Sequence, residues 1–294
     1  MQYIDKHPMI MIVIGVLGIS LSAIFVKYSA APSAVTAAFR LSWTVLLMSP
    51  VIWAKREIRE ELFRIDKREL LLSVFSGLFL AIHFVLWFES LQHTSVASST
   101  SIVCTEVIWV ALGFCLFLKG TLTKQAVLAI MISFAGSVLI AYADSSVGGA
   151  HLYGDILALV SAVAVAAYTL LGRIVRNSVS TSVYTYVVYV SCAAVLLGTC
   201  LVQGYPLFGY GVSAVIVGLL LSVFSTILGH SIFSWCLKYF SPAFVSASKL
   251  CEPVVASIIA VFLFSELPSV LQIFGGTMII GGVYYYSRIE KAAE

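Results

Sequence analysis

The chain has 294 residues, of which 61% are hydrophobic and 11% are charged, and its formal net charge is +3. A soluble domain carries about 25% charged residues, so this composition excludes an ordinary soluble enzyme and a disordered chain. The small net charge gives no basis for nucleic acid as a partner. The sequence therefore predicts an integral membrane protein whose surroundings are a lipid bilayer.

Ten apolar segments follow one another along the chain, each close to the roughly 20 residues that a membrane-spanning helix needs. They lie at 8–31, 33–54, 70–91, 94–118, 123–143, 153–173, 180–202, 212–237, 242–264 and 268–287. None alternates with period 2, so helices are favoured over a membrane β-barrel. The first segment is longer than the apolar part of a signal peptide, and we expect it to be retained as a span. The predicted fold class is an all-α integral membrane protein with ten transmembrane helices.

The basic residues between the apolar segments all fall on one side of a ten-span arrangement. They are Lys6, Lys55, Arg56, Arg59, Arg64, Lys67, Arg68, Lys119, Lys124, Arg173, Arg176, Lys238, Arg288 and Lys291. Positively charged loops face the cytoplasm. We therefore expect a multi-pass protein of the cell (inner) membrane with both termini in the cytoplasm.

The two halves of the sequence repeat each other at an offset near 147 residues. At this offset His83 corresponds to His230 and Cys104 corresponds to Cys251. Each half carries five predicted spans, and an odd number inverts the second half in the membrane, as in many secondary transporters. The prediction is two inverted five-helix repeats, 1–146 and 147–294. Chance similarity among apolar helices is the alternative.

Four of the ionisable side chains inside predicted spans are the informative ones, Arg40, Glu106, Lys249 and Glu252, because each is expensive to insert and marks a candidate functional site. Lys249 and Glu252 are three residues apart, so they could form an ion pair on one helix face or contact a substrate. Glu106 could carry a proton, contact a substrate, or pair with Arg40 or Lys249. Arg40 could hold a carboxylate with two hydrogen bonds, or it could tie helices together.

Polar and aromatic side chains recur at helical spacing beside these charges, and we expect three such stripes to converge on one cavity. The first contains Thr36, Arg40 and Trp43, and the second contains Ser76, Leu80, His83, Trp87 and Ser90. The third contains Ser95, Ser98, Ile102, Glu106, Trp109 and Gly113. His83 and His230 are substrate-site candidates by symmetry, although buried packing is an alternative for both. Trp87 and Trp109 could instead be anchors at the membrane interface.

The cysteines predict no disulfide framework or metal site. All six lie in apolar stretches, and no CxxC pair or Cys/His cluster occurs. We expect no metal and no cofactor. Small residues recur at helical spacing in three places, where they would allow close helix contacts: Gly15, Gly18 and Ser22; Ala129, Ser133 and Ser137; and Gly281 with Gly282.

Short motifs near the predicted helix ends resemble a known transporter family. In the first half they are Pro32, Ala38-Phe39-Arg40-Leu41, His83-Phe84, Trp87-Phe88, Ser90-Leu91 and Thr94-Ser95-Val96-Ala97-Ser98-Ser99. In the second half they are Ser241-Pro242-Ala243, Glu252-Pro253, Phe264-Ser265-Glu266, Gln272, Gly276 and Gly281-Gly282-Val283. With these motifs the whole chain resembles the EamA-type, ten-helix branch of the drug/metabolite transporter superfamily. It departs from that pattern at Thr105-Glu106-Val107, where members often have a proline, and at Lys119-Gly120, where they often have Gly-Glu.

The resemblance implies export or exchange of small organic solutes by alternating access. The sequence predicts a secondary transporter of metabolites, an exporter of amino acids or related compounds, coupled to protons or to a counter-substrate. The mixed-sign buried charges suit a zwitterion. The alternatives are a channel-like facilitator and an intramembrane enzyme. An enzyme is disfavoured because GxSxG and HExxH are both missing, and the lack of a GxxxxGK[ST] sequence disfavours ATP-driven pumping. We expect a monomer, because one chain could enclose a cavity between its halves.

Overall fold

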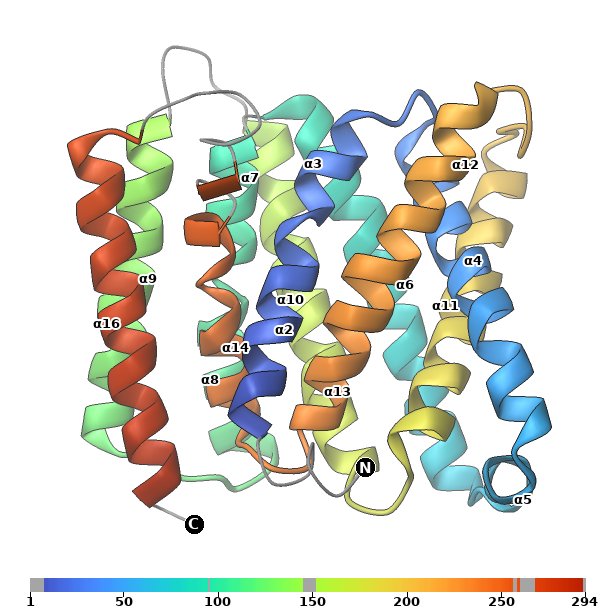
Figure 1. Cartoon of the computed structure of the whole chain (residues 1–294), viewed down its shortest axis with the longest axis horizontal. Helices are drawn as coiled ribbons and strands as arrows, with labels where there is room; N and C mark the ends of the chain where they lie inside the picture. The colour runs from blue at the N-terminus through green and yellow to red at the C-terminus, as the bar shows by residue number, and fades with distance from the viewer. Residues whose placement is uncertain (1–7, 95, 145–151, 256–257, 260–267, 293–294) are drawn as a thin grey trace.

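The structure is a computed structural model that describes residues 8–94, 96–144, 152–255, 258–259 and 268–292. Within these ranges the chain forms helices joined by short connections, and no strand is present (Figure 1). Seven helices of the described part are long and apolar enough to cross a membrane, and a shorter apolar helix spans Lys124–Ile140. The seven are Pro8–Val26, Ser33–Ala54, Lys67–His93, Ser99–Phe117, Leu152–Val175, Thr181–Val202 and Gly211–Cys236. The predicted all-helical membrane architecture is confirmed to this extent.

Most of the predicted apolar segments coincide with helices. The elements are α2 (Pro8–Ser20), α3 (Ser22–Lys27), α4 (Ser33–Ala54), α5 (Arg56–Arg64), α6 (Lys67–His93), α7 (Val96–Val103), α8 (Glu106–Phe117), α9 (Lys124–Asp144), α10 (Leu152–Val175), α11 (Thr181–Val202), α12 (Gly211–Leu220), the π-helix η1 (Leu221–Ser231), α13 (Ile232–Cys236), α14 (Pro242–Lys249) and α16 (Val270–Ala292). The motif 264–266 lies outside the described residues, as do residues 256–257 and 260–263 of the segment that leads to it.

Several helix starts follow from local sequence. Ser180 precedes α11 and accepts a hydrogen bond from the backbone N–H of Val183. Ser241 precedes α14 in the same way, and Pro242 occupies the first turn of that helix. Both serines satisfy donors that a helix start would otherwise leave without partners, and proline at this position loses nothing by lacking an N–H.

Two of the predicted spans are each divided near the middle by a two-residue turn in the described part of the chain. The span predicted at 94–118 is divided by a turn at residues 104–105, where the Thr105 N–H donates to the Ile102 carbonyl (3.0 Å). The span predicted at 242–264 is divided by a turn at residues 250–251, where the Leu250 N–H donates to the Ala247 carbonyl (3.1 Å). These bonds reach back three residues instead of four, so the helix tightens locally and its faces change direction.

The helices lie side by side in an elongated bundle (Figure 1). α6 packs mainly on α10 and α11, α4 on α11 and α12, and α2 on η1, while α8 packs on α10 and α14. α9 and α16 pack on each other at one edge of the bundle (Figure 1). The start of α2 and the end of α16 lie at the same end of the bundle as α5 (Figure 1). The described basic loops are therefore gathered at one end.

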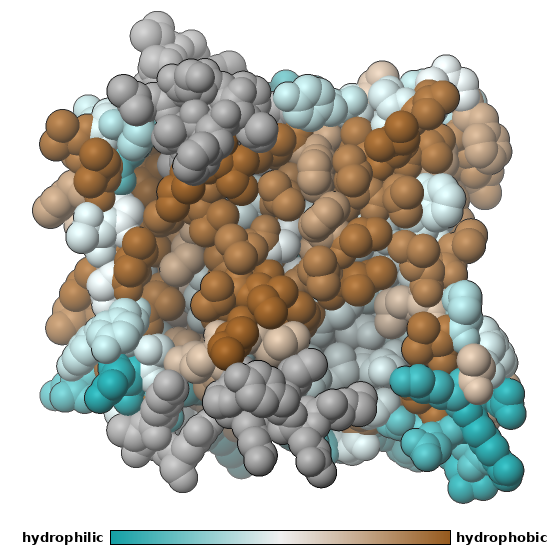
Figure 2. All heavy atoms as spheres, viewed as in Figure 1, coloured by the Kyte–Doolittle hydropathy of each residue, from teal (hydrophilic) through white to brown (hydrophobic). Residues whose placement is uncertain are grey.

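The outer surface suits a bilayer. Apolar side chains cover the middle of the face shown in Figure 2, and polar side chains gather at the end that carries α5. Large hydrophobic residues on many helices are exposed, among them Leu46, Phe75 and Leu116. An apolar surface of this extent is unfavourable in water and favourable against lipid. The protein is a multi-pass membrane protein.

The longest basic loop contains a helix, α5, where the apolar pattern of the sequence predicts only a connection. α5 pairs Arg56 with Glu60 one turn later, at 2.6 Å between Nε and Oε1. Oε1 of Glu61 accepts a hydrogen bond from the Ser180 backbone N–H (2.6 Å). α5 thereby connects the loop to the start of α11.

Of the expected close helix contacts at small residues, those of Gly18 and of Gly282 with Ala129 and Ser133 are present, whereas a Cβ on Gly281 would meet nothing within 4 Å; Gly136 and Gly275 make a further one. A Cβ built on Gly136 of α9 would lie 2.5 Å from the carbonyl oxygen of Gly275 on α16, and the reverse distance is 2.7 Å. A Cβ built on Gly18 of α2 would lie 2.6 Å from the carbonyl oxygen of Phe224 in η1. Only glycine allows two backbones to approach so closely.

Candidate functional site

A small cavity lies where the two interrupted spans meet. Its volume is about 40 Å³. The lining residues come from α6, α7, α8, α14 and the two mid-span turns: Trp87, Thr100, Val103, Cys104, Glu106, Ser246, Lys249, Leu250 and Glu252. Three of them are ionisable groups within apolar segments, which is where functional residues of membrane proteins concentrate.

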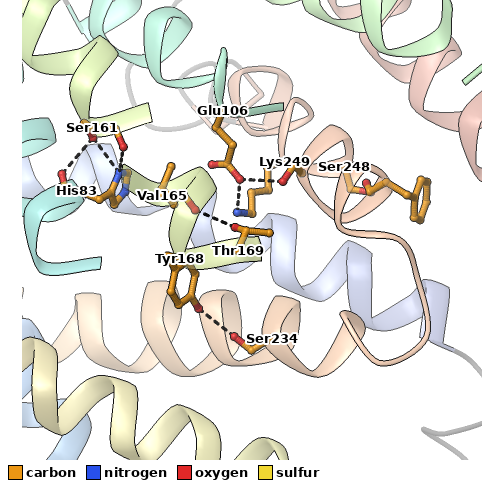
Figure 3. Close-up of polar contacts among 11 residues, drawn as sticks. His83, Glu106, Ser161, Val165, Tyr168, Thr169, Ser234, Ser248 and Lys249 are labelled. Atoms are coloured by element: carbon orange, nitrogen blue, oxygen red, sulfur yellow. Dashed lines mark hydrogen bonds and ion pairs between the residues drawn. The ribbon is translucent and has the colours of Figure 1, made fainter. Parts of the chain in front are cut away.

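Glu106 and Lys249 form an ion pair in this cavity (Figure 3). The Lys249 Nζ donates to Oε1 of Glu106 at 2.6 Å, and the Ser246 hydroxyl donates to the same oxygen at 3.0 Å. Both charged side chains are largely buried, and Nζ also lies 5.5 Å from the centre of the Phe233 ring. A buried pair is stable only while both members are present, because either one alone is an uncompensated charge.

The ion pair that the sequence suggested between Lys249 and Glu252 is not formed. The turn at residues 250–251 separates them, so a spacing of three residues no longer places them on one helix face. Glu252 still lines the same cavity, partly buried, and it makes no ion pair with a described residue. The cavity thus holds two carboxylates and one ammonium group.

His83 is fixed by α10. Its Nδ1 lies 2.8 Å from the Ser161 hydroxyl oxygen and 3.2 Å from the Ser161 carbonyl oxygen (Figure 3). The Ser161 hydroxyl also lies 3.1 Å from the His83 carbonyl oxygen. All these contacts are satisfied together when Nδ1 carries the proton and the hydroxyl donates to the carbonyl. The His83 ring stacks on the Trp87 ring with 5.8 Å between centres, so it adjoins the cavity.

Arg40 lies in a second polar cluster and is 1% exposed. Its Nε donates to the Thr226 hydroxyl (2.8 Å), and its Nη1 donates to the Ser22 hydroxyl (3.3 Å). The guanidinium carbon lies 4.1 Å from the centre of the Phe84 ring. Thr226 belongs to η1, and π-helical turns occur frequently at functional sites.

His230 contacts the same phenylalanine. Its ring meets the Phe84 ring edge to face, with 5.4 Å between centres, and it meets the Tyr168 ring at 5.9 Å. The Tyr168 hydroxyl shares a hydrogen bond with the Ser234 hydroxyl (2.9 Å; Figure 3). His230 is also buried and belongs to η1. The two symmetry-related histidines thus lie in one aromatic group.

Comparison with known proteins gives the family. The EamA-like transporter family matches residues 7–142 and again residues 152–288. The chain belongs to the EamA-like transporter family. The resemblance drawn from the sequence motifs is confirmed, and membership of this family is consistent with the drug/metabolite transporter superfamily.

Curated relatives of this EamA-like chain are named as uncharacterized transporters. One from Clostridium kluyveri is 24% identical over 70% of this chain and 68% of its own length. One named YxxF from Bacillus subtilis is 27% identical over 74% of this chain and 70% of its own. One from Archaeoglobus fulgidus is 24% identical over 81% of this chain and 83% of its own. The names support a membrane transporter and give no substrate.

A solved structure has the same fold. A crystal structure described only as that of a protein matches with a TM-score of 0.80, covering 98% of this chain and 99% of its own. The sequence identity is 17%, so the match concerns the fold alone.

Two further predicted site residues of the EamA-like chain, Trp43 and Trp109, do not line the cavity. Trp109 is 38% exposed on α8, and Trp43 is partly exposed on α4. Ser98 belongs to α7, but its side chain lies outside the described part of the structure. Within the described residues, no three His, Cys, Asp or Glu side chains are grouped as metal ligands would be.

Several contact residues were not anticipated from the sequence. Ser161 and Tyr168 lie on one face of α10, seven residues apart. Ser161 contacts Nδ1 of His83, and the Tyr168 ring contacts the His230 ring. Ser246 supports Glu106, and Thr226 supports Arg40. Seven-residue spacing on a helix was the available signal for the first two, but small hydroxyl residues at this spacing are common in membrane helices.

Proposed function

We propose that the chain is a secondary transporter of small organic metabolites, an exporter of amino acids or related compounds that works by alternating access. The observation that carries this proposal is the Glu106–Lys249 pair, which is buried where two interrupted helices meet beside a cavity. Transporters place their substrate sites near the membrane midplane, at interrupted helices. The family match and the names of the relatives support transport.

We further propose ten spans in two inverted five-helix repeats, about 1–146 and 147–294. The helix pairs support this symmetry, because exchanging the halves turns the α6–α10 contact into the α2–η1 contact. The same exchange turns α6–α11 into α4–η1. Three further contacts, α4–α11, α8–α14 and α9–α16, are unchanged by the exchange, because each joins two helices that correspond to each other in the two halves. The two family matches fall in the two halves.

Residue contacts in the α9–α16 interface support the same symmetry. The Ser133 hydroxyl donates to the carbonyl of Ile279, a residue 146 positions further along (3.5 Å). A shift of 146 positions carries Gly136 to position 282 and Ala129 to position 275. The two flanking close approaches, Gly136–Gly275 and Ala129–Gly282, are therefore related to each other by this shift. The same shift carries the turn at 104–105 onto the turn at 250–251. Glu106 and Lys249 therefore belong to symmetry-related regions of the two halves.

In this proposal the two halves move against each other around the cavity. The Glu106–Lys249 pair joins them, so a transport step that opens the cavity has to change this contact. A proton taken up by Glu106 would remove its negative charge and weaken the pair, and a charged counter-substrate could act in the same way. Either event would couple transport to a second gradient.

We propose the inner membrane, with cytoplasmic termini, as the setting, and the monomer as the unit. The gathering of the basic loops at the α5 end supports this orientation. The test is labelling of spheroplasts with a membrane-impermeant maleimide, using Phe208→Cys in the 203–210 connection and Glu60→Cys in α5. Labelling of Phe208→Cys alone, above the background of the native cysteines, is the expected result. The opposite pattern would refute the orientation.

The function is tested by efflux from proteoliposomes loaded with amino acids, nucleosides and small amines. Mass spectrometry measures which compounds leave. The expected result is selective, saturable release of one class that is accelerated by the same compound outside. Such exchange identifies a carrier, whereas release that rises linearly with concentration would indicate a channel-like facilitator. A product that was not loaded would indicate an enzyme.

Two variants make the efflux test specific to the cavity. Glu106→Gln is expected to slow release, because it removes one charge of the buried pair. Glu57→Gln is the matched control, because Glu57 lies in the first turn of α5 at the membrane surface. Equal release by both variants and the native chain would remove Glu106 from the mechanism.

A further inference from the structure

Arg40 is a buried cation whose partners in the described structure are all neutral. It contacts the hydroxyls of Thr226 and Ser22 and the ring of Phe84. No described carboxylate lies within ion-pair distance of it, and its Nη2 has no hydrogen-bond partner. A guanidinium in this setting bears the cost of leaving water without the compensation of a counter-ion.

Other polar atoms without partners gather around the same aromatic group. The Nδ1 of His230 is buried and makes no hydrogen bond, and its ring contacts the Phe84 ring that Arg40 covers. The Nε1 of Trp87 is also buried without a partner, and Trp87 lines the Glu106 cavity. Buried polar atoms are nearly always paired, so three such atoms in one cluster call for a ligand.

A second buried arginine shows what a structural role looks like in this chain. Arg176 is 5% exposed, and its Nε donates to the Ser234 carbonyl at 3.2 Å. Its Nη1 donates to the carbonyl of Val179. Arg176 thus fastens the end of α10 to α13 through backbone acceptors. Arg40 has no such acceptor, although it is more deeply buried.

Two ionisable side chains of the interior, Arg40 and Glu252, have no ion-pair partner among the described residues. The pair Glu106–Lys249 is neutral as a whole, which leaves the guanidinium of Arg40 and the carboxyl group of Glu252 outside it. A ligand that carries an acid group would compensate Arg40, and an amino group on the same ligand would suit Glu252. Such a ligand, with one acid group and one amino group, would have no net charge.

We propose that Arg40 binds the acid group of the transported substrate, a carboxylate, and that His230 and Trp87 complete this subsite. The proposal rests on the transport function proposed above and assigns its anionic contact. A guanidinium presents two parallel N–H donors to a carboxylate, and the free Nη2 is available for this geometry. Thr226 already donates its own proton to the Leu221 carbonyl, so it positions Arg40 and does not compete for the acid group.

A stability comparison tests this role without knowledge of the substrate. Arg40→Met removes an uncompensated charge and is expected to leave the melting temperature of the purified protein unchanged or higher. Arg176→Met removes donors from two backbone carbonyls and is expected to lower it. If Arg40→Met lowers the melting temperature as much as Arg176→Met does, Arg40 is a structural tie and the proposal is wrong. If Arg40→Met does not fold, Arg40→Lys, which keeps the charge, takes its place in this comparison of melting temperatures.

A flux comparison tests the chemistry. Proteoliposomes are loaded with the common amino acids together with their decarboxylated amines. The native protein is expected to release amino acids in preference to the matched amines, and Arg40→Met is expected to reduce that release at least about tenfold. Arg40→Lys should be intermediate because it lacks the planar fork. Arg56→Met, at the exposed α5 surface, is the control and should behave like the native chain.

The outcomes separate the two proposals. Release of amines and amino acids at equal rates, unaffected by Arg40→Met, would overturn the Arg40 subsite and leave the transport function standing. Release of neither set would overturn the proposed function for these compounds, and the subsite would fall with it. Selective release of amino acids that Arg40→Met abolishes, with the melting temperature retained, would support both.

Discussion

Lys249 ends α14 and Glu106 begins α8, and the 2.6 Å contact between them joins two helices at the points where both are interrupted. Each residue lies next to a turn whose backbone hydrogen bonds reach back three residues. Because such turns change the direction of a helix face, they can bring a carboxylate and an ammonium group from distant parts of the chain into one small cavity. The ion pair is thus a consequence of the two interruptions.

The first prediction concerns this pair. Glu106→Gln and Lys249→Met should each destabilise the protein by about 3–5 kcal/mol, because each leaves a buried charge without its partner. The double variant should lose less than the sum of the two, since it leaves no charge behind. Unfolding of the purified protein measures all four members of the cycle. Additive losses would mean that the two side chains do not interact.

The second prediction concerns coupling. If Glu106 carries the coupled proton, efflux by the native protein should depend on the pH difference across the membrane, and efflux by Glu106→Gln should not. The glutamine cannot exchange a proton, although it retains an oxygen that can accept from Lys249. Proteoliposomes with imposed pH gradients provide the measurement. An unchanged pH response in Glu106→Gln would assign coupling elsewhere. Unchanged substrate affinity in a folded Lys249→Met would remove Lys249 from substrate binding.

The third prediction uses two adjacent glycines of α16. A Cβ on Gly282 would lie 2.9 Å from the Ala129 carbonyl oxygen, whereas a Cβ on Gly281 would meet nothing within 4 Å. Gly282→Ala should therefore reduce the free energy of unfolding by about 1–3 kcal/mol through overpacking, and the melting temperature should fall. Gly281→Ala should raise it slightly, because alanine favours the helix. Equal effects of the two substitutions would contradict the α9–α16 packing.

The fourth prediction concerns the support of His83. Ser161→Ala removes the hydroxyl that contacts Nδ1 and the His83 carbonyl, so we expect a loss of about 1 kcal/mol in stability. Ser191→Ala is the matched control, because the Ser191 hydroxyl donates within its own helix to Val187. Thermal unfolding compares the two. If the control is as destabilised as Ser161→Ala, the contact with His83 contributes nothing.

The fifth prediction concerns the surface helix. Glu61→Ala should destabilise the start of α11 by about 1 kcal/mol, because Glu61 accepts from the Ser180 N–H at a helix N-terminus, where a negative charge is favourable. Glu57→Ala, on the same helix, should have little effect. Hydrogen exchange at the first residues of α11 measures the difference. Equal exchange in both variants would show that α5 does not stabilise α11.

The bundle could be predicted because composition and periodicity act over whole helices. α4 begins and ends where the segment 33–54 was expected, since twenty or so apolar residues have few alternatives in a membrane. α5 was not anticipated as a helix, because its charged sequence gave no apolar signal. Its stability comes from pairs such as Arg56–Glu60 and from its contact with Ser180.

The site was harder to predict because sequence periodicity assumes unbroken helices. The expected stripe that runs through Glu106 to Trp109 crosses the turn at 104–105, and Trp109 proves to be exposed. Lys249 and Glu252 failed to pair for the same reason, at the turn at 250–251. Arg40 and the two histidines, which lie away from these turns, were recognised as buried polar residues. Their partners on α10 and η1 could not be deduced without the fold.

The packing of α9 on α16 also sets an order for the assembly of the protein during synthesis. α9 is synthesised before α10 to α14, so its glycine face has to wait for a partner that the ribosome makes much later. During that interval Gly136 faces lipid, an insertion factor or a provisional neighbour. The bundle can close along this edge only once α16 has been inserted. A nascent chain stalled before Val270 would therefore remain open there and accessible to quality-control proteases.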